Sequence, residues 1–208
     1  MRVSVYVDGF NLYYRALKNS PYKWLNLAEI AKPVLLHPDD TVTMVRYFTA
    51  RVSARSGSSD APRKQQIYLS ALKTLPIVQI HYGKFLAKTK TRPLVSDPKK
   101  YVEVHDTEEK GSDVNLAVHL LNDGWHKRYD LALVFSQDTD LIEPIRIARQ
   151  ELGLQVGLIQ MDSGRPNRDL ALAASFVRHL KPAHFQAAQF PNQVAKPNGE
   201  MIVKPQGW

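Results

Sequence analysis

The sequence lacks cysteine entirely among its 208 residues. Disulfide bonds, iron–sulfur clusters, thiolate zinc sites and cysteine nucleophiles are therefore excluded. Long apolar runs are also missing: the run from Val3 to Val7 is interrupted by Ser4 and is too short for a signal peptide. No stretch approaches the length of a membrane span. We expect a cytoplasmic protein without a membrane partner.

Acidic residues are fewer than basic ones. The chain has 28 Lys and Arg against 20 Asp and Glu, which gives a net charge of +8 at pH 7. This excess favours a polyanionic partner, although many basic proteins are merely soluble. The length suits one α/β domain with additions, and it is sufficient to bury a substantial core.

Short apolar runs alternate with segments of helical spacing along most of the chain. Strands are predicted over residues 3–7, 41–51, 77–81, 131–135, 155–160 and 175–180. Helices are predicted over residues 11–18, 24–32, 64–74, 108–123, 141–150 and 167–174. Short connections and right-handed crossovers then favour an α/β fold with a doubly wound, mainly parallel sheet of five or six strands, in the order 3-2-1-4-5.

The composition changes at Pro182. Residues 182–208 are punctuated by Pro191, Pro197 and Pro205 and show little periodicity. We predict a domain over residues 1–181 followed by an extended appendage over residues 182–208. The oligomeric state is open, and a homodimer is one of the states that the sequence allows.

The stretch LALVFSQDTDLIE, residues 131–143, carries the strongest chemical signal. An uninterrupted apolar strand ends there and is followed at once by Ser136, Asp138 and Asp140. An Asp often caps the helix that follows a strand. One cap needs one carboxylate, so the second is left for another role.

Two further acids are predicted to reach the same edge of the sheet. Asp8 ends the first strand, and Asp113 lies in the first turn of the helix before the fourth strand. In the predicted order these two strands are neighbours, and ligands of such sheets bind where the winding reverses between them. Turn or cap chemistry is the alternative for Asp8, and a surface carboxylate near a helix N-terminus is the alternative for Asp113.

The four carboxylates would repel one another. Two like charges 4 Å apart cost about 1 kcal/mol in water and roughly 4 kcal/mol near a protein surface. Protonation or a shared divalent cation relieves that cost. Oxygen ligands without His or Cys suit Mg²⁺ or Mn²⁺. The predicted metal ligands and catalytic residues are Asp8, Asp113, Asp138 and Asp140, and the predicted supporting residues are Asn11 and Ser136.

A basic segment follows the third predicted strand. It contains a single acid, Asp97, and these cations: Lys84, Lys88, Lys90, Arg92, Lys99 and Lys100. Tyr82, Phe85 and Tyr101 flank them, and basic and aromatic residues together suit a nucleic-acid strand. A solvated hairpin with charged edges is the alternative. The other residues predicted to guide the strand are Arg51, Arg55 and Arg63.

Three segments of the chain together resemble a known family. VDGFNLYY, EEKGSDVNLAVHLLND and VFSQDTDLIEPIR, in this order over about residues 1–180, are similar to the motifs of NYN-domain proteins of the PIN-like nuclease superfamily, with the LabA-like branch as the best match. The resemblance implies a metal-dependent ribonuclease centre in which the four acids fall on the family's acidic positions. Gln137 stands where the family usually has Gly, and Ser112 replaces a commonly apolar residue.

Three functions are consistent with these residues. The favoured hypothesis is hydrolysis of RNA phosphodiester bonds with Mg²⁺ or Mn²⁺, which can activate a water molecule and stabilise the charge that develops on the phosphate. The second is an RNA-binding or scaffolding protein that keeps the fold and cleaves nothing. The third is a metal-dependent phosphatase or nucleotide-sugar transferase, in which pairs of Asp residues also hold metal-bound phosphates.

Overall fold

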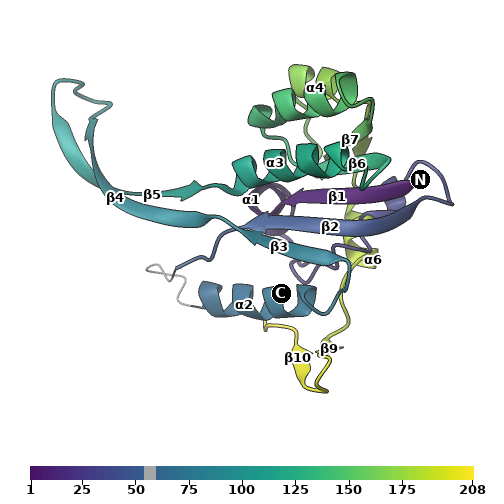
Figure 1. Ribbon diagram of the computed structural model, residues 1–208. Helices are drawn as coiled ribbons and strands as arrows, with labels where there is room; N and C mark the ends of the chain where they lie inside the picture. The colour runs from purple at the N-terminus through teal and green to yellow at the C-terminus, as the bar shows by residue number, and fades with distance from the viewer. Residues whose placement is uncertain (54–59) are drawn as a thin grey trace.

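A six-stranded parallel sheet forms the centre of the protein (Figure 1). The computed structural model describes residues 1–53 and 60–208. In spatial order the strands are β3 (Val78–Tyr82), β2 (Thr41–Thr49), β1 (Arg2–Asp8), β6 (Leu131–Phe135), β7 (Gln155–Gln160) and β8 (Phe176–His179). Counted along the chain without the separate β4–β5 hairpin, this order is 3-2-1-4-5-6, which confirms the predicted winding.

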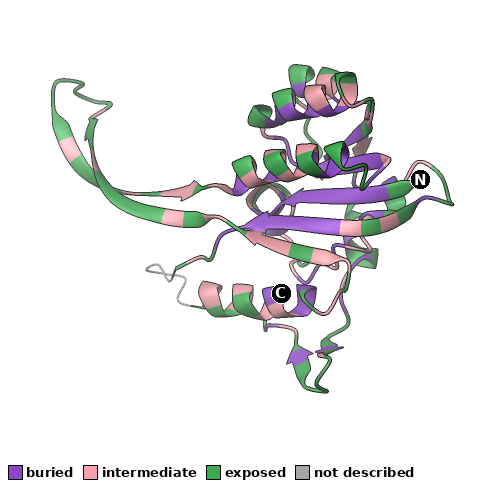
Figure 2. Cartoon of the chain, in the orientation of Figure 1, coloured by how far each residue is buried: buried purple, intermediate pink, exposed green. Residues whose placement is uncertain are grey.

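The two central strands are buried on both faces. The register pairs Val3 with Leu131 and Val7 with Phe135, so β1 and β6 end side by side. All five side chains of β6 are fully buried, as the continuous apolar run predicts (Figure 2). Asp8, the last residue of β1, and Ser136, the first residue after β6, therefore emerge together at the carboxyl edge of the sheet.

Helices cover both faces of the sheet, and each face has its own apolar core. The helices are α1 (Gly9–Leu12), η1 (Tyr13–Leu17), η2 (Lys32–Val34), α2 (Ala61–Leu72), α3 (Ser112–Trp125), η3 (Thr139–Leu141), α4 (Ile142–Gln150), α5 (Arg168–Ala173) and α6 (Pro182–Ala187). Leu116 of α3 and Ile145 of α4 pack on one face, and Leu69 of α2 and Phe185 of α6 pack on the other (Figure 1). In the described part of the chain, no helix is long and apolar enough to span a membrane.

The helix predicted over residues 24–32 is wrong. The segment runs as a loop with turns that ends in the short helix η2. Its backbone bonds with a distant segment, because Asn26 N–H donates to the carbonyl of Ala188 and Phe190 N–H donates to that of Trp24. The apolar spacing of this segment reflects burial against the C-terminal region and not a helical stripe.

A long two-stranded arm leaves the domain at the carboxyl edge of the sheet (Figure 1). Its strands are β4 (Lys84–Pro93) and β5 (Tyr101–Lys110), which pair antiparallel. Most of its side chains are exposed or half-buried (Figure 2). The prediction that a helix begins at Glu108 is therefore wrong. Residues 108–110 complete β5, and α3 begins only after Gly111, whose positive φ of 99° favours glycine.

Residues 182–208 fold onto the domain and do not form an extended appendage. They contain α6 and the hairpin of β9 (Gln193–Ala195) and β10 (Met201–Val203). Phe185, Phe190, Val194 and Ile202 are buried in the same core as β1. The indole N–H of Trp24 donates to the carbonyl of Pro191 at 2.8 Å, which ties the two ends of the chain together.

A buried polar network spans the α3 side of the sheet. Asp123 accepts hydrogen bonds from Tyr6 Oη at 2.8 Å, from Arg46 Nε at 2.6 Å and from Arg46 Nη2 at 2.9 Å. A further bond comes from Arg128. Burial opposes ionisation of Asp123, but the hydrogen bonds from Arg46, Tyr6 and Arg128 outweigh it and lower the pKa of its carboxyl. The network cross-links β1, β2 and α3.

We expect Asp123→Asn to lower the free energy of unfolding by about 3–5 kcal/mol, because it leaves the Arg46 guanidinium buried without its counter-charge. Urea denaturation at pH 7 measures this change. Glu143→Gln is the control, since it breaks an exposed pair with Arg146 and should leave the midpoint nearly unchanged. Equal effects of the two substitutions would contradict a structural role for the network.

Candidate active site

Asp8 lies where β1 ends, and both of its carboxylate oxygens have partners. Oδ1 accepts the backbone N–H of Asn11 at 2.9 Å and so caps α1. Oδ2 accepts the hydroxyl of Ser136 at 2.9 Å. Burial raises the pKa of the Asp8 carboxyl. Asp8 can therefore cap α1 and also belong to the acidic cluster, because one oxygen accepts the bond from α1 while the other accepts the bond from Ser136 after β6.

The turn after β6 is held by the residues that the sequence predicts as supporting. Ser136 Oγ accepts the N–H of Asp138 at 3.1 Å, and the side-chain oxygen of Asn11 accepts the N–H of Gln137 at 3.1 Å. Asp138 in turn caps η3, because its Oδ1 accepts the N–H of Asp140 at 3.0 Å. Asn11 and Ser136 therefore lock the two acidic turns to each other.

The two departures from the family pattern are accommodated. The Gln137 amide points into the protein, where it donates to the carbonyls of Ser136 and Ile159. It leaves the acidic turn unobstructed. Ser112 Oγ donates to Glu109 Oε1 at 2.8 Å and fixes that side chain at the start of α3.

Of the four predicted site acids, Asp113 has the carboxyl whose pKa departs most from its ordinary value. Burial raises the pKa of its carboxyl to about 6, and the negative charges of Asp8, Asp138, Glu109 and Asp140 add to this rise. The shift means that these acids act on one another through space. Asp113 lies in the first turn of α3, as the sequence predicts.

Asp8, Asp113 and Asp138 line a single cavity of about 870 Å³ at the carboxyl edge of the sheet. Asp140 is exposed and does not line it, whereas Glu109 does. Glu109 was not among the predicted site residues, because residue 109 was predicted to lie inside a helix. Its position two residues before Gly111 was the available signal. Within the described residues, no three His, Cys, Asp or Glu side chains already stand in a metal-holding group.

Aromatic side chains form another part of the cavity wall, and the sequence analysis did not identify them as a group. They are Phe10, Tyr13, Tyr14, Tyr47, Tyr68, Phe85 and Trp208. Gly9 allows this wall to close, because a Cβ there would stand 2.7 Å from the backbone oxygen of Phe48 and equally near the Tyr47 ring. The basic residues that line the cavity, Arg15, Lys18, Lys23 and Lys64, were also missed.

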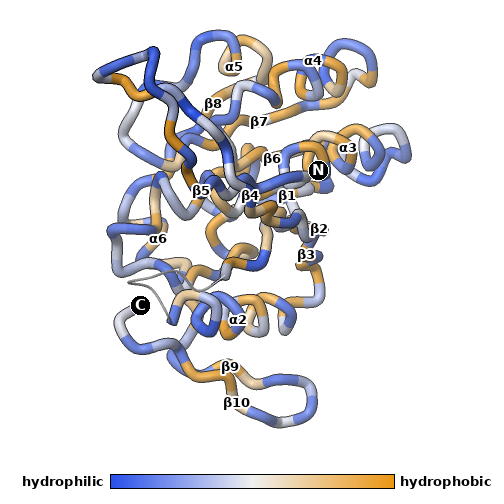
Figure 3. The backbone as a smooth tube through the Cα atoms, turned by 90° about the vertical axis from the view of Figure 1, so that its left-hand side faces the viewer, coloured by the Kyte–Doolittle hydropathy of each residue, from blue (hydrophilic) through white to orange (hydrophobic). Residues whose placement is uncertain are grey.

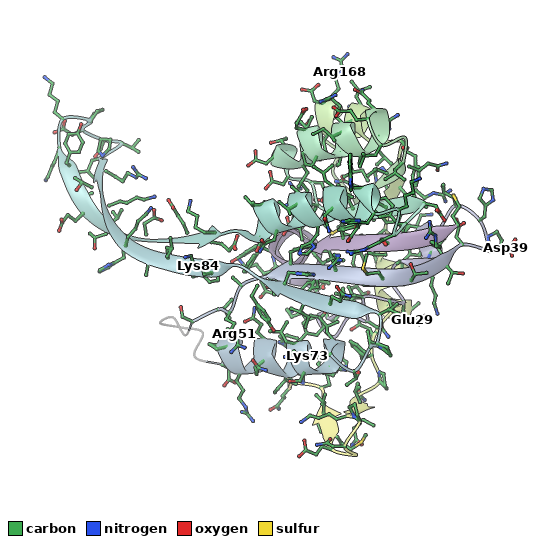
Figure 4. All side chains as sticks on the ribbon, in the orientation of Figure 1. Glu29, Asp39, Arg51, Lys73, Lys84 and Arg168 are labelled. Atoms are coloured by element: carbon green, nitrogen blue, oxygen red, sulfur yellow. The ribbon has the colours of Figure 1, made fainter. Side chains whose placement is uncertain are left out.

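Of the predicted nucleic-acid contacts, those that the structure describes do not line the cavity. Lys84 marks the root of the arm, Arg51 lies near α2 (Figure 4), and Arg63 is exposed on α2. Lys99 and Lys100 lie at the far end of the arm, between its strands. Arg55 falls outside the described residues.

The register of the arm separates its lysines from the cavity. Phe85, Thr107 and Glu109 share one face of the ribbon and line the cavity. Since successive side chains of a strand point to opposite faces, Lys84, Lys88, Lys90 and Arg92 share the other face. Acids on the arm partly neutralise them, because Lys88 pairs with Glu108 and Lys90 with both Asp106 and Glu108.

Comparison with solved structures supports the fold. A protein of unknown function, VPA0982 from Vibrio parahaemolyticus RIMD 2210633, superposes with a TM-score of 0.56. The match covers 87% of this chain and 93% of that one at 16% sequence identity. An identity this low supports the shared fold alone.

Comparison with characterised sequences gives a relative that is named as a monooxygenase. The 6-hydroxy-3-succinoylpyridine 3-monooxygenase HspA of Pseudomonas putida (strain DSM 28022 / S16) is 28% identical over 240 aligned positions. The alignment covers all of this chain and 75% of HspA.

The family comparison covers nearly the whole sheet. The profile of the NYN domain matches residues 2–180, a range that begins with β1 and ends just after β8. It includes the ends of β1 and β6 and the start of α3, where Asp8, Asp138 and Asp113 are found. The chain belongs to the NYN domain family, which is part of the PIN-like nuclease superfamily.

Proposed function

We propose that the protein hydrolyses RNA phosphodiester bonds with the help of Mg²⁺ or Mn²⁺ held at Asp8, Asp113 and Asp138. The observation that carries this proposal is the meeting of these carboxylates in one cavity, with a mutual repulsion that helps to raise the pKa of Asp113. Membership of a nuclease-like family supports it. Asp140 stands just outside and adds negative potential.

The donor set fits a hard divalent cation. Only oxygen ligands are offered, and Mg²⁺ usually keeps several waters while binding one or two carboxylates and substrate phosphate oxygens. Such an ion does not require three side chains to be gathered beforehand. When bound, it would supply Lewis-acid stabilisation of the phosphoryl oxygens.

The chain's own residues orient the acids. Ser136 and Asn11 fix the carboxylate of Asp8 and the turn that carries Asp138. These bonds hold Asp8 and Asp138 at the wall of the cavity. Glu109, held by Ser112, is placed to accept a proton from a water molecule or to add a ligand.

A labelled pool of mixed RNA and DNA, incubated with Mg²⁺, Mn²⁺ or EDTA, tests this function. Cleavage of RNA that EDTA abolishes is the expected result. Binding without cleavage under all conditions would favour the scaffolding hypothesis, and release of phosphate from monoesters would favour a phosphatase.

The aromatic wall favours a second candidate function, the monooxygenation of a small aromatic acid. HspA is named for a reaction of a substituted pyridine, and an aromatic cavity with lysines in its wall could hold such a ring and a carboxylate. Oxygen uptake with 6-hydroxy-3-succinoylpyridine and an added two-electron donor would reveal it. No uptake together with metal-dependent RNA cleavage would exclude it.

Metal binding should stabilise the folded protein. We expect Mn²⁺ to raise the melting temperature, because a ligand that binds only the folded state shifts the equilibrium toward it. Asp138→Asn and Asp113→Asn should each remove most of this rise and abolish RNA cleavage. Asp97→Asn, on the arm, is the control and should behave as the wild type does. A collapse of the metal-free Asp138→Asn or Asp113→Asn protein would instead identify that carboxylate as structural.

The raised pKa of Asp113 predicts how stability without metal depends on pH. Since the folded-state pKa is about 6 and the unfolded value is lower, ionised Asp113 destabilises the fold. The wild type should therefore lose stability relative to Asp113→Asn as the pH rises from 4 through 6. Solvent screening limits the difference to an order of 1 kcal/mol. Parallel urea titrations in EDTA measure it, and a constant difference across this range would contradict the shift.

The arm should contribute to RNA binding through its unpaired cations. Among the described residues, Lys84 and Arg92 have no acid within ion-pair distance, whereas Lys88 and Lys90 do. Replacing Lys84 and Arg92 by Ala should flatten the plot of log affinity against log salt by up to about 1.4, or roughly 0.7 per phosphate contact. The matched Lys88→Ala, Lys90→Ala double variant should flatten it less. Filter binding across a salt series measures these slopes. An unchanged slope for the Lys84→Ala, Arg92→Ala double variant would show that these arm residues do not contact RNA phosphates.

A further inference from the structure

Two tyrosines at the cavity are unusually open to solvent. Tyr13 is 37% exposed and Tyr14 is 61% exposed. Their rings meet edge to face with centroids 5.3 Å apart. Exposed aromatic rings are poorly explained by the core, and they favour contact with a planar ligand.

The backbone presents these rings in an uncommon way. Residues Tyr13–Leu17 form a π-helical turn, and Lys18 N–H donates to the carbonyl of Tyr13 at 2.7 Å. Wide turns of this kind often occur at functional sites. Leu17 is buried and anchors the turn, so Tyr13 and Tyr14 are left on its outer side.

A second aromatic group lies against α2, in the same core as Leu17. Trp208 packs edge to face on Tyr68 of α2, with ring centroids 5.9 Å apart. Figure 3 looks onto this edge, with α3 above and α2 below. Because the cavity is lined by residues of both helices, it extends from Asp113 on α3 to Tyr68 and Lys64 on α2.

Cations accompany the aromatic rings. Lys18 Nζ lies 5.2 Å from the centroid of the Tyr14 ring, and Lys23 and Lys64 also line the cavity. The wall of the cavity thus offers aromatic rings, ammonium groups and carboxylates together. A ligand that matches it carries planar rings and several anionic groups spaced along its length.

We propose that Tyr13, Tyr14 and Trp208 form a stacking subsite for nucleobases of single-stranded RNA, next to the phosphodiester at the acids. This inference rests on the proposed function and adds how the strand is held. Lys18 and Lys64 would contact the phosphates between stacked bases. A volume near 870 Å³, at the large end of small-molecule sites, and cations spread over two elements favour a strand over a single small acid.

A short RNA with one 2-aminopurine base tests the subsite, since stacking changes the fluorescence of that base. Binding is measured in EDTA, so that the RNA stays intact. Tyr14→Ala should weaken binding roughly 5- to 150-fold, the usual effect of removing one stacking ring, and should reduce the fluorescence change. Tyr14→Phe keeps the ring and should retain both.

Trp125→Ala is the matched control, because Trp125 is 73% exposed at the end of α3 and does not line the cavity. It should leave affinity and fluorescence unchanged, and all variants should keep the wild-type melting temperature. Equal affinity of wild type and Tyr14→Ala for the RNA would overturn the proposal. Binding of nicotinate that depends on Tyr14, without binding of the RNA, would overturn it in favour of a small aromatic acid.

Failure of this inference is separable from failure of the proposed function. Cleavage of the same RNA with Mn²⁺ is measured in parallel on the wild type. If the RNA is cut but Tyr14→Ala binds it normally, only the stacking subsite is wrong. If the base stacks in EDTA but no metal ion supports cleavage, the hydrolytic function is wrong and the subsite stands.

Discussion

The parallel pairing of β1 with β6 is the constraint on which the rest of the site depends. It ends two buried strands at one place and so forces Asp8 and the Ser136–Asp138 turn into contact. The hydrogen bond from Ser136 to Asp8 forms because the two strands end side by side. Since α3 runs antiparallel to the strands, its first turn brings Asp113 to the same edge. Three segments far apart in sequence meet because the sheet reverses its winding there.

Two of the acidic side chains at the cavity also cap helices. Asp8 and Asp138 each give one oxygen to a helix cap, which offsets part of the cost of gathering negative charge. Asp113 makes no such cap, and burial, with the neighbouring negative charges after it, raises the pKa of its carboxyl. Near the other end of α3, the buried Asp123 pairs with Arg46, and the pKa of its carboxyl is lowered. The two carboxylates on this one helix therefore differ in the direction of their pKa shift.

The sheet order and the convergence of Asp8, Asp113 and Asp138 could be predicted because both follow from local patterns: buried runs, strand ends and short crossovers. The position of Glu109 at the cavity could not be predicted, since it depends on β5 continuing to Lys110. The arm lysines illustrate the same limit. Their number is visible in the sequence, but their pairing with Asp106 and Glu108 and their place on one face follow from the hairpin register. Tyr14 and Trp208 lie too far apart in the chain for any spacing rule to join them.

The proposed hydrolysis of RNA depends on a divalent cation at the carboxyl edge of the sheet. Anomalous diffraction from crystals soaked in Mn²⁺ and measured near the manganese absorption edge tests this most directly. We predict a peak within coordination distance of carboxylate oxygens from Asp8 and from Asp113 or Asp138. Full-occupancy peaks elsewhere with none in this cavity would contradict the account.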